Sequence, residues 1–209
     1  MSSNTETTVA RAPKRARGKQ RVAELLEAAA SVFAEKGYEA ATMTEIAARA
    51  RAPIGSLYQF FTAKEALADM LVQNFVALLA ADLRELEARA AEIDNQTLVE
   101  RLFGLLRSHP HERAAALPLA EARMDERTRR TTFRYMLRKH IAAILHARAP
   151  SLPAETTRDM AIVVLQMMKA ASALSDEDGL AGRAAGVRDL QALAVQYLEQ
   201  RLRPYSVRG

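Results

Sequence analysis

Apolar residues recur at spacings of three and four along nearly the whole chain, which is the pattern of helices that bury one face. The first such stripe lies within residues 18–36 and consists of Val22, Leu25, Leu26, Ala29, Val32 and Phe33. We find no segment that alternates apolar and polar residues as a half-buried strand would. Glycine and proline are scarce, at 8 and 7 of 209 residues, and they fall between the periodic runs. The pattern predicts an all-α protein.

Capping residues divide the first third of the chain into short helices. Gly37 follows the first stripe and can supply the positive φ that ends a helix. The sequence Thr42-Met-Thr-Glu45 is that of a capping box, which predicts a second helix ending near Arg49 or Ala50. Pro53 suits the first turn of a third helix over residues 54–61.

The rest of the chain predicts longer helices. A second capping-box sequence, Thr62-Ala-Lys-Glu65, opens a fourth helix that runs through Ala81 or further. Later helices are predicted at 96–108, 120–148, 154–175 and 186–202, with a short turn between Pro110 and Pro118. We therefore expect a disordered basic arm (1–20), a small three-helix domain (21–67) and a helical bundle (68–209).

Charge and composition limit the possible classes of function. The net charge is +5, and residues 10–21 hold six arginines and lysines without an acidic residue. Such an arm is attracted to polyanions, although a solubilising tail has the same composition. The absence of cysteine excludes disulfides and thiolate metal sites and fits a reducing cytoplasm. No apolar run has the length of a signal peptide or a membrane span. We expect a cytoplasmic protein without membrane contact, metal or cofactor.

The second and third predicted helices, joined by a tight turn, have the arrangement of a helix-turn-helix. A helix that enters the major groove needs small leading residues, and Gly55 and Ser56 meet this need. Leu57 and Phe61 are four residues apart and can anchor the buried side. Tyr58 then faces outward, where its hydroxyl could donate a hydrogen bond to a phosphate.

Lys64 lies beside the positive end of the predicted fourth helix, where a cation is unfavourable by roughly a few tenths of a kcal/mol. A residue that opposes the local electrostatics of a well-capped helix suggests a function. Together with the free N–H groups of the helix start, Lys64 could bind a DNA phosphate. Taken alone, a solvated lysine that tolerates the small penalty is the simpler interpretation.

Three sequences occur in order between Arg21 and Leu67: AAASVFAEKGYEAATMTEIAARA, GSLYQFF and KEAL. This stretch, about a third of the chain, resembles the DNA-binding domain of the tetracycline-repressor (TetR) family of bacterial transcriptional regulators. The resemblance implies an N-terminal helix-turn-helix domain followed by a helical bundle for ligand binding and dimerisation. It assigns DNA contacts to Thr42, Thr44, Ile54, Gly55, Ser56, Tyr58, Gln59 and Lys64.

The sequence departs from the family pattern at three positions. Arg51 stands in the turn where glycine is usual, and a left-handed arginine is unfavourable by on the order of 1 kcal/mol. Either the turn is remodelled or Arg51 adds a phosphate contact. Phe60 replaces a common histidine or tyrosine, and Pro53 replaces a frequent serine. In the basic arm, Arg15 and Arg17 are predicted to enter the minor groove.

The later helices suggest a partner and a ligand. The segment 154–175 is apolar on nearly all sides, which favours burial against a second subunit as well as its own domain. An intramolecular core in a monomer is the alternative. The residues predicted for a homodimer interface are Val164, Met168, Leu190, Leu193 and Tyr197. Those predicted to line an effector pocket are Phe103, Phe133, Met136, His140, Met160 and Met167, although methionines are more often core filler.

Three classes of function follow. The resemblance implies a homodimeric repressor that binds a palindromic double-stranded operator and is released by a small-molecule effector. An activator or an effector-free architectural DNA-binding protein would share these features. An all-α enzyme is disfavoured, because we find no His-Glu-x-x-His or Gly-x-Ser-x-Gly motif, no glycine-rich phosphate loop and no cysteine nucleophile. A helical protein-interaction module is the third class.

Overall fold

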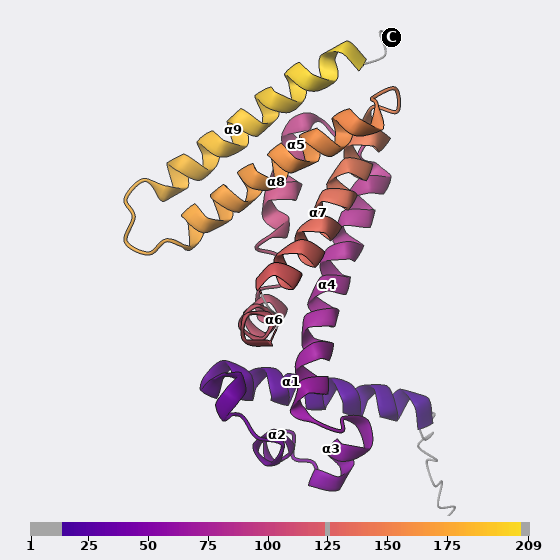
Figure 1. Ribbon diagram of the computed structural model, residues 1–209, viewed down its shortest axis with the longest axis vertical. Coiled ribbons are helices and arrows are strands. Elements are labelled where there is room, and N and C mark those ends of the chain that lie inside the picture. Colours follow the sequence, from indigo (N-terminus) through magenta and orange to yellow (C-terminus); the bar gives the residue numbers. More distant parts are fainter. Residues whose placement is uncertain (1–13, 124–125, 206–209) are drawn as a thin grey trace, which may run out of the picture. The chain divides into compact units, whose positions relative to one another are not determined.

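The computed structural model describes residues 14–123 and 126–205 of the chain. Within these residues the chain forms nine α-helices, one short 3-10 helix and no strand, which confirms the all-α class (Figure 1). The elements are α1 Lys14–Ala40, α2 Met43–Arg49, α3 Ile54–Phe60, α4 Lys64–Arg89, α5 Asn95–Leu105, α6 Pro110–Arg123, α7 Glu126–Arg148, α8 Ala154–Asp176, α9 Arg183–Leu202 and η1 Arg203–Tyr205. The chain divides into an N-terminal unit, Met1–Leu71, and a C-terminal unit, Val72–Gly209.

The first helix is longer than its apolar stripe. It begins at Lys14, so residues 14–20 are helical and do not belong to a disordered arm. The physical reason is local: apart from Gly18 these residues are good helix formers, and Pro13 and the threonines lie before them. The remaining arm residues, 1–13, lie outside the described part. Gly37 interrupts the helical conformation with a φ of 76°, as its position after the stripe predicts.

The N-terminal unit is built by α1, α2 and α3, with α1 packing on α2 and α2 on α3. Leu25, Ile46 and Leu57 are completely buried in it, as is Leu67 at the start of α4, so each of these helices contributes an apolar anchor. Burial of a leucine or isoleucine side chain stabilises a fold by about 1.5–3 kcal/mol. Four such residues are a large part of what a unit of this size can bury.

Helix starts in this unit agree with the capping pattern. The Thr42 hydroxyl accepts from the Glu45 N–H at 3.3 Å, and the Glu45 carboxylate accepts from the Thr42 N–H at 3.1 Å. This is the predicted capping box, and α2 ends at Arg49 as expected. Pro53 is the N-cap of α3. α4 begins at Lys64, one residue later than predicted, and continues to Arg89.

The C-terminal unit has one large apolar core. α7 packs on α8, α8 on α9 and α5 on α9, and Figure 1 shows α8 and α9 lying side by side. Fully buried members of this core include Leu98, Ile141 and Leu198. Along the described chain, α4 alone is long and apolar enough to cross a membrane by length and composition, a weak criterion that core helices also meet.

The segment around Pro110 and Pro118 differs from the predicted short turn. It is helical throughout α6, which begins at Pro110 and contains Pro118. A proline inside a helix removes the hydrogen bond to the carbonyl four residues earlier. Here that carbonyl belongs to Ala114, and Ala114 and Pro118 are both exposed, so water can replace the lost donor. His109 precedes the helix with a φ of 52°, and its Nε2 lies 2.7 Å from the Asp82 carboxylate of α4.

Candidate nucleic-acid interface

The turn between α2 and α3 keeps a left-handed residue although this residue is an arginine. Arg51 has a φ of 50°, its N–H donates to the Ala48 carbonyl at 3.0 Å, and the Ala52 N–H donates to the Ala47 carbonyl at 2.9 Å. The turn is therefore closed by hydrogen bonds. The left-handed conformation itself is unfavourable by about 1–2 kcal/mol for a residue other than glycine. The Arg51 side chain is exposed. Its guanidinium has no hydrogen-bond or ion-pair partner among the described residues.

One side of α3 is exposed along its full length. Ile54 and Tyr58 are 41% and 50% exposed, one helical turn apart, and Gly55 and Gln59 are exposed beside them. Leu57, on the opposite side, is completely buried. Of the predicted reading residues only Ser56 is half-buried. The structure thus brings Ile54, Gly55, Tyr58 and Gln59 onto one open face, whereas Ser56 lies at its edge.

Phe60 belongs to the same short helix and was not predicted as a contact. It is 42% exposed, although an aromatic ring is usually buried. The sequence signal was present, because Phe60 stands where the family pattern has a polar residue. With Ile54 it adds apolar surface to α3, of the kind that can contact the methyl group of thymine.

The two threonines at the start of α2 have different environments. The Thr42 hydroxyl accepts from the Glu45 N–H and donates to its carboxylate at 2.9 Å, so its donor is already used in capping. Thr44, two residues later, is exposed. The capping role of Thr42 is confirmed, whereas its predicted phosphate contact would have to compete with Glu45.

The acidic side chains near this surface are neutralised by cations. Arg49 donates to both carboxylate oxygens of Glu35 at 2.6 Å, and Lys36 donates to Glu45. The hydrogen bond from Arg49 holds the pKa of Glu35 below its ordinary value of 4.5. The hydrogen bonds from Lys36 and then from the Thr42 hydroxyl do the same for the pKa of Glu45. Both pairs join α1 to α2, so they position the start of the helix-turn-helix.

These shifts predict acid sensitivity of the N-terminal unit. A carboxyl group whose pKa is lower in the folded state stabilises the fold above its unfolded pKa, and this contribution is lost as the pH falls through the folded pKa. We expect the melting temperature of this unit to fall as the pH drops below 4.5, the ordinary pKa of Glu35 and Glu45. Calorimetry of the full chain at pH 6 and pH 3 measures the decrease. A variant with Glu35→Gln and Glu45→Gln should melt lower at pH 6 and show a smaller decrease, and an equal decrease would contradict the assignment.

Lys64 is held by the protein itself. It is the first residue of α4 and is half-buried. Its ammonium donates to the backbone carbonyls of Tyr38, Glu39 and Ala41 at 2.9, 2.9 and 3.3 Å. The sequence predicted an ammonium available to DNA phosphate, and the structure places three carbonyl oxygens around it.

The basic arm is described only in part. Arg17 lies in α1 and is exposed, whereas the side chain of Arg15 lies outside the described residues. Because helical backbone already begins at Lys14, Arg17 is part of a regular helix and cannot act as an extended minor-groove arm without unwinding it.

Two of the predicted dimer residues cannot contact a partner. Val164 and Met168 are completely buried in the core of their own unit, so the prediction was wrong for both. An apolar helix offers several faces, and the packing of α8 against α7 and α9 turned these residues inward. Leu190 and Tyr197 are half-buried, and Leu193 is 53% exposed on α9.

The predicted effector-pocket residues do not enclose a described cavity. Phe103 and Met160 are core residues, at 6% and 0% exposure, while Phe133, Met136 and Met167 pack against that core. A cavity of about 1020 Å³ lies elsewhere, beside the end of α7 and the outer side of α9. Two smaller ones, of about 310 and 250 Å³, lie at Tyr135 and at Asp82. None of the six predicted residues, His140 included, lines these three cavities.

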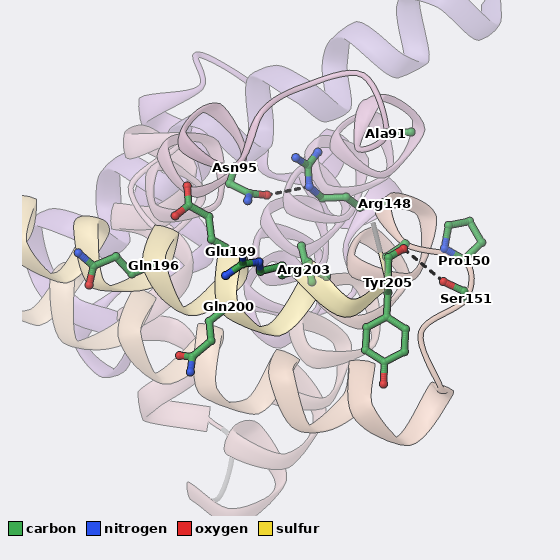
Figure 2. A pocket seen from close by; sticks show the side chains of 12 residues that line it. Ala91, Asn95, Arg148, Pro150, Ser151, Gln196, Glu199, Gln200, Arg203 and Tyr205 are labelled. Carbon is green, nitrogen blue, oxygen red and sulfur yellow. Dashed lines mark hydrogen bonds between the residues drawn. The ribbon is translucent and has the colours of Figure 1, made fainter. Parts of the chain in front are cut away.

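Arg148 forms one wall of the 1020 Å³ cavity (Figure 2). Its guanidinium donates to the Asn95 side chain and to the Ala90 carbonyl, both at 2.8 Å, and to the Ile93 carbonyl. These contacts tie the turn between α4 and α5 to the end of α7. In the same view the Ser151 hydroxyl donates to the Tyr205 carbonyl at 3.4 Å. Sequence reasoning missed this place, because its residues come from three segments that are far apart along the chain.

Comparisons with known proteins agree with this geometry. Residues 25–71 match the family described as bacterial regulatory proteins, tetR family, and residues 92–198 match the tetracyclin repressor-like C-terminal domain. The transcriptional repressor KstR2 of Mycobacterium tuberculosis is 42% identical over 82 residues, which are 39% of this chain and 38% of KstR2. The chain thus matches little more than a third of that relative.

Solved structures extend the likeness to the whole fold. A TetR-family transcriptional regulator from Mesorhizobium loti has a TM-score of 0.65 at 21% identity, over 91% of this chain and 99% of its own. A gamma-butyrolactone receptor has a TM-score of 0.53 at 23% identity, over 87% and 99%. At this identity the likeness shows the fold alone. Since the C-terminal match itself covers more than half of the chain, the protein belongs to the tetR family of bacterial regulatory proteins, which are DNA-binding transcriptional regulators and not enzymes.

Proposed function

We propose that this protein is a cytoplasmic, homodimeric transcriptional repressor that binds a palindromic DNA operator and is released from it by a small-molecule effector. The observation that carries the proposal is the open face of α3, where Gly55, Tyr58 and Gln59 are exposed while Leu57 anchors the opposite side. The major groove admits an α-helix, and small, unobstructed leading residues let its backbone approach the base edges closely. The contacts assigned to DNA are Thr44, Arg51, Ile54, Gly55, Ser56, Tyr58 and Gln59, with Thr42 and Arg17 at the flank.

Tyr58 and Arg51 are assigned to the DNA backbone. The phenol of Tyr58 is half-exposed and can donate to a phosphate, and the guanidinium of Arg51 is exposed in the turn. An unfavourable backbone conformation is retained where the side chain is useful, which supports a phosphate contact by Arg51. Gln59 can pair with a base edge, and Ile54 can contact a methyl group.

The surface of the last two helices supports a homodimer. Leu193 of α9 and Ile162 of α8 are 53% and 43% exposed, so each of these helices presents a large aliphatic side chain that a partner could bury. A two-fold interface built from α8 and α9 would cover them. Two α3 helices would then read half-sites about 34–36 Å apart, one turn of the duplex.

We propose a small molecule as the effector and assign it to no narrower chemical class. One structural neighbour is a gamma-butyrolactone receptor, so this fold accommodates small ligands in at least one protein. α4 contributes residues to both units, so a ligand that shifts this helix in the C-terminal unit can change the N-terminal unit as well. Release requires that the effector favour a conformation that does not bind DNA.

The full chain should select specific duplexes from a randomised pool. We expect a palindromic consensus, two chains for each selected duplex, and an affinity that falls steeply with salt, with a slope of about −0.9 for each phosphate neutralised. Fluorescence anisotropy at 50–200 mM salt measures affinity and stoichiometry. No enrichment even at 50 mM salt would contradict DNA binding, and a consensus without symmetry at one chain for each duplex would contradict the dimer.

Removal of one hydroxyl tests the phosphate contact of Tyr58. The variant Tyr58→Phe keeps the ring and its packing, so we expect roughly a threefold to tenfold loss of affinity, equivalent to one neutral hydrogen bond. The loss should be the same for the selected duplex and for a random one, because a phosphate contact carries no base information. Tyr135→Phe, with the same change at a residue of α7 that is 62% exposed, is the matched control and should leave affinity unchanged. A changed consensus for Tyr58→Phe would assign it to a base.

A further inference from the structure

Lys64 has a set of partners that accounts for its whole hydrogen-bonding capacity. An ammonium has three donors. Three backbone carbonyls, of Tyr38, Glu39 and Ala41, lie at 2.9, 2.9 and 3.3 Å from its nitrogen. Such charge-assisted bonds are roughly twice as strong as neutral ones. A DNA phosphate could bind this ammonium only by displacing one of the carbonyls.

These carbonyls also remove the electrostatic conflict at the start of α4. Two of them belong to Tyr38 and Glu39, which follow the break in α1 at Gly37, and the third belongs to Ala41, just after α1 ends. Carbonyl oxygens carry partial negative charge, and hydrogen bonds to a charged donor are stronger than neutral ones. Lys64 therefore lies beside the positive end of α4 and is stabilised there by three direct hydrogen bonds. The position that looked unfavourable in the sequence is favourable in the fold.

Tyr38 completes the arrangement. The Lys64 ammonium lies 4.6 Å from the centre of the Tyr38 ring, within the range of a cation–π interaction. The Tyr38 hydroxyl donates to the Glu65 carboxylate at 3.0 Å, and its ring centre is 5.7 Å from that of Phe33 in the core. Gly37, with its φ of 76°, redirects the chain just before Tyr38. Residues 38–41 are thus fastened to the start of α4 by backbone and side-chain contacts.

Residues 38–41 lead directly into the helix-turn-helix formed by α2 and α3. Ala41 precedes Thr42, the N-cap of α2, and α2 packs against α3. We infer that Lys64 is a positioning residue, which holds the turn before α2 against the first turn of α4 and thereby sets the placement of the DNA-reading helices, and that it does not bind a DNA phosphate. The assignment rests on the proposed function, since it concerns how this unit reads DNA.

Salt dependence distinguishes positioning from phosphate binding. The variant Lys64→Met keeps the aliphatic stem and removes the ammonium. We expect it to bind the selected duplex about tenfold more weakly, the equivalent of one charge-assisted hydrogen bond, with an unchanged salt slope. A lost phosphate contact would instead reduce the magnitude of the slope by about 0.9. Arg107→Met removes one positive charge from an exposed residue of the C-terminal unit, outside α8 and α9, so it controls for net charge and should bind as the original chain does.

A charge-conserving variant gives a second comparison. Arginine binds phosphate at least as well as lysine, but its planar fork cannot place donors on three carbonyls that converge on one point. We therefore expect Lys64→Arg to lose about as much affinity as Lys64→Met, roughly tenfold. All binding is measured at 10 °C, well below the melting transition of each variant, so that a loss of stability alone does not lower affinity. Affinity restored by arginine would overturn the inference.

Hydrogen exchange in the DNA-free protein tests the positioning directly. In Lys64→Met we expect the amides of residues 41–46 to exchange at least tenfold faster, since the turn that carries the α2 cap is released. Amides of α8 provide the internal reference. Unchanged exchange at residues 41–46, or a salt slope reduced by about one, would overturn the inference. If the original chain selects no duplex, the proposed function fails, and the exchange measurement still decides whether Lys64 holds the turn.

Discussion

Replacement of Gly55 by glutamate is expected to lower the affinity for duplex DNA at least a hundredfold while leaving α3 as stable as before or more so. Gly55 is the second residue of α3, is exposed, and has nothing within 4 Å of the place where a Cβ would be. Glutamate is a better helix former than glycine by roughly 0.5–1 kcal/mol, and an acid near a helix start contributes about 0.3–1 kcal/mol more. The fold therefore accepts the residue.

The same carboxylate would face the DNA phosphates if α3 lies in the major groove. Like charges brought together at an interface are unfavourable by several kcal/mol, and a hundredfold loss corresponds to about 2.7 kcal/mol. Anisotropy with the selected duplex gives the affinity, and thermal melting gives the stability. Gly55→Gln separates size from charge, and Gly104→Glu adds the same charge at an exposed glycine of α5 with equal free space. If Gly55→Glu binds DNA normally, α3 is not the reading helix.

Truncation of Leu57 to alanine is expected to destabilise the N-terminal unit by about 3 kcal/mol, within the range for leucine in a core. Leu57 is completely buried, and it is the one buried residue of α3, so no neighbour on its own helix can compensate. Small domains have only about 5–15 kcal/mol in total. Such a loss should unfold this unit at a temperature at which the C-terminal unit remains folded.

Urea denaturation followed by NMR can separate the two units, because Ile46 and Ile141 report on different cores. We expect the Ile46 signal to shift to lower urea and the Ile141 signal to stay. DNA affinity should fall at 37 °C and recover on cooling, since the exposed face of α3 is unchanged. Leu57→Met conserves volume and should cost less than about 1.5 kcal/mol. A loss below about 1 kcal/mol for Leu57→Ala would mean that α3 is not anchored through this residue.

Local signals in the sequence were sufficient to predict much of the structure of the N-terminal unit. The capping box of Thr42 and Glu45 and the exposure of Tyr58 opposite Leu57 depend on residues within one or two helical turns of each other. Interactions between such near neighbours have the same residue spacing in different proteins, so a sequence pattern predicts them. The conformation of Arg51 was left open by the sequence, which allowed a remodelled turn, and the structure keeps a left-handed residue there with a φ of 50°.

Other features could not follow from local patterns. Val164 and Leu193 are both aliphatic residues on apolar helices, yet one is completely buried and the other is 53% exposed. A stripe of apolar residues predicts that one face of a helix will be buried. Which residues of an apolar helix are covered, and by which neighbour, depends on how the helices pack. Pro118 is similar: whether a helix tolerates it depends on water reaching the carbonyl of Ala114, which the fold decides.

By itself, the sequence determined that this protein is helical and where its first helices begin, because capping and periodicity act between near neighbours, and its motifs carry the resemblance to the tetR family. The tertiary structure alone decided what the Lys64 ammonium binds. Its three carbonyl partners are 26, 25 and 23 residues away along the chain. An ammonium is attracted to any nearby oxygen, so its partner is set by which oxygens folding brings within reach.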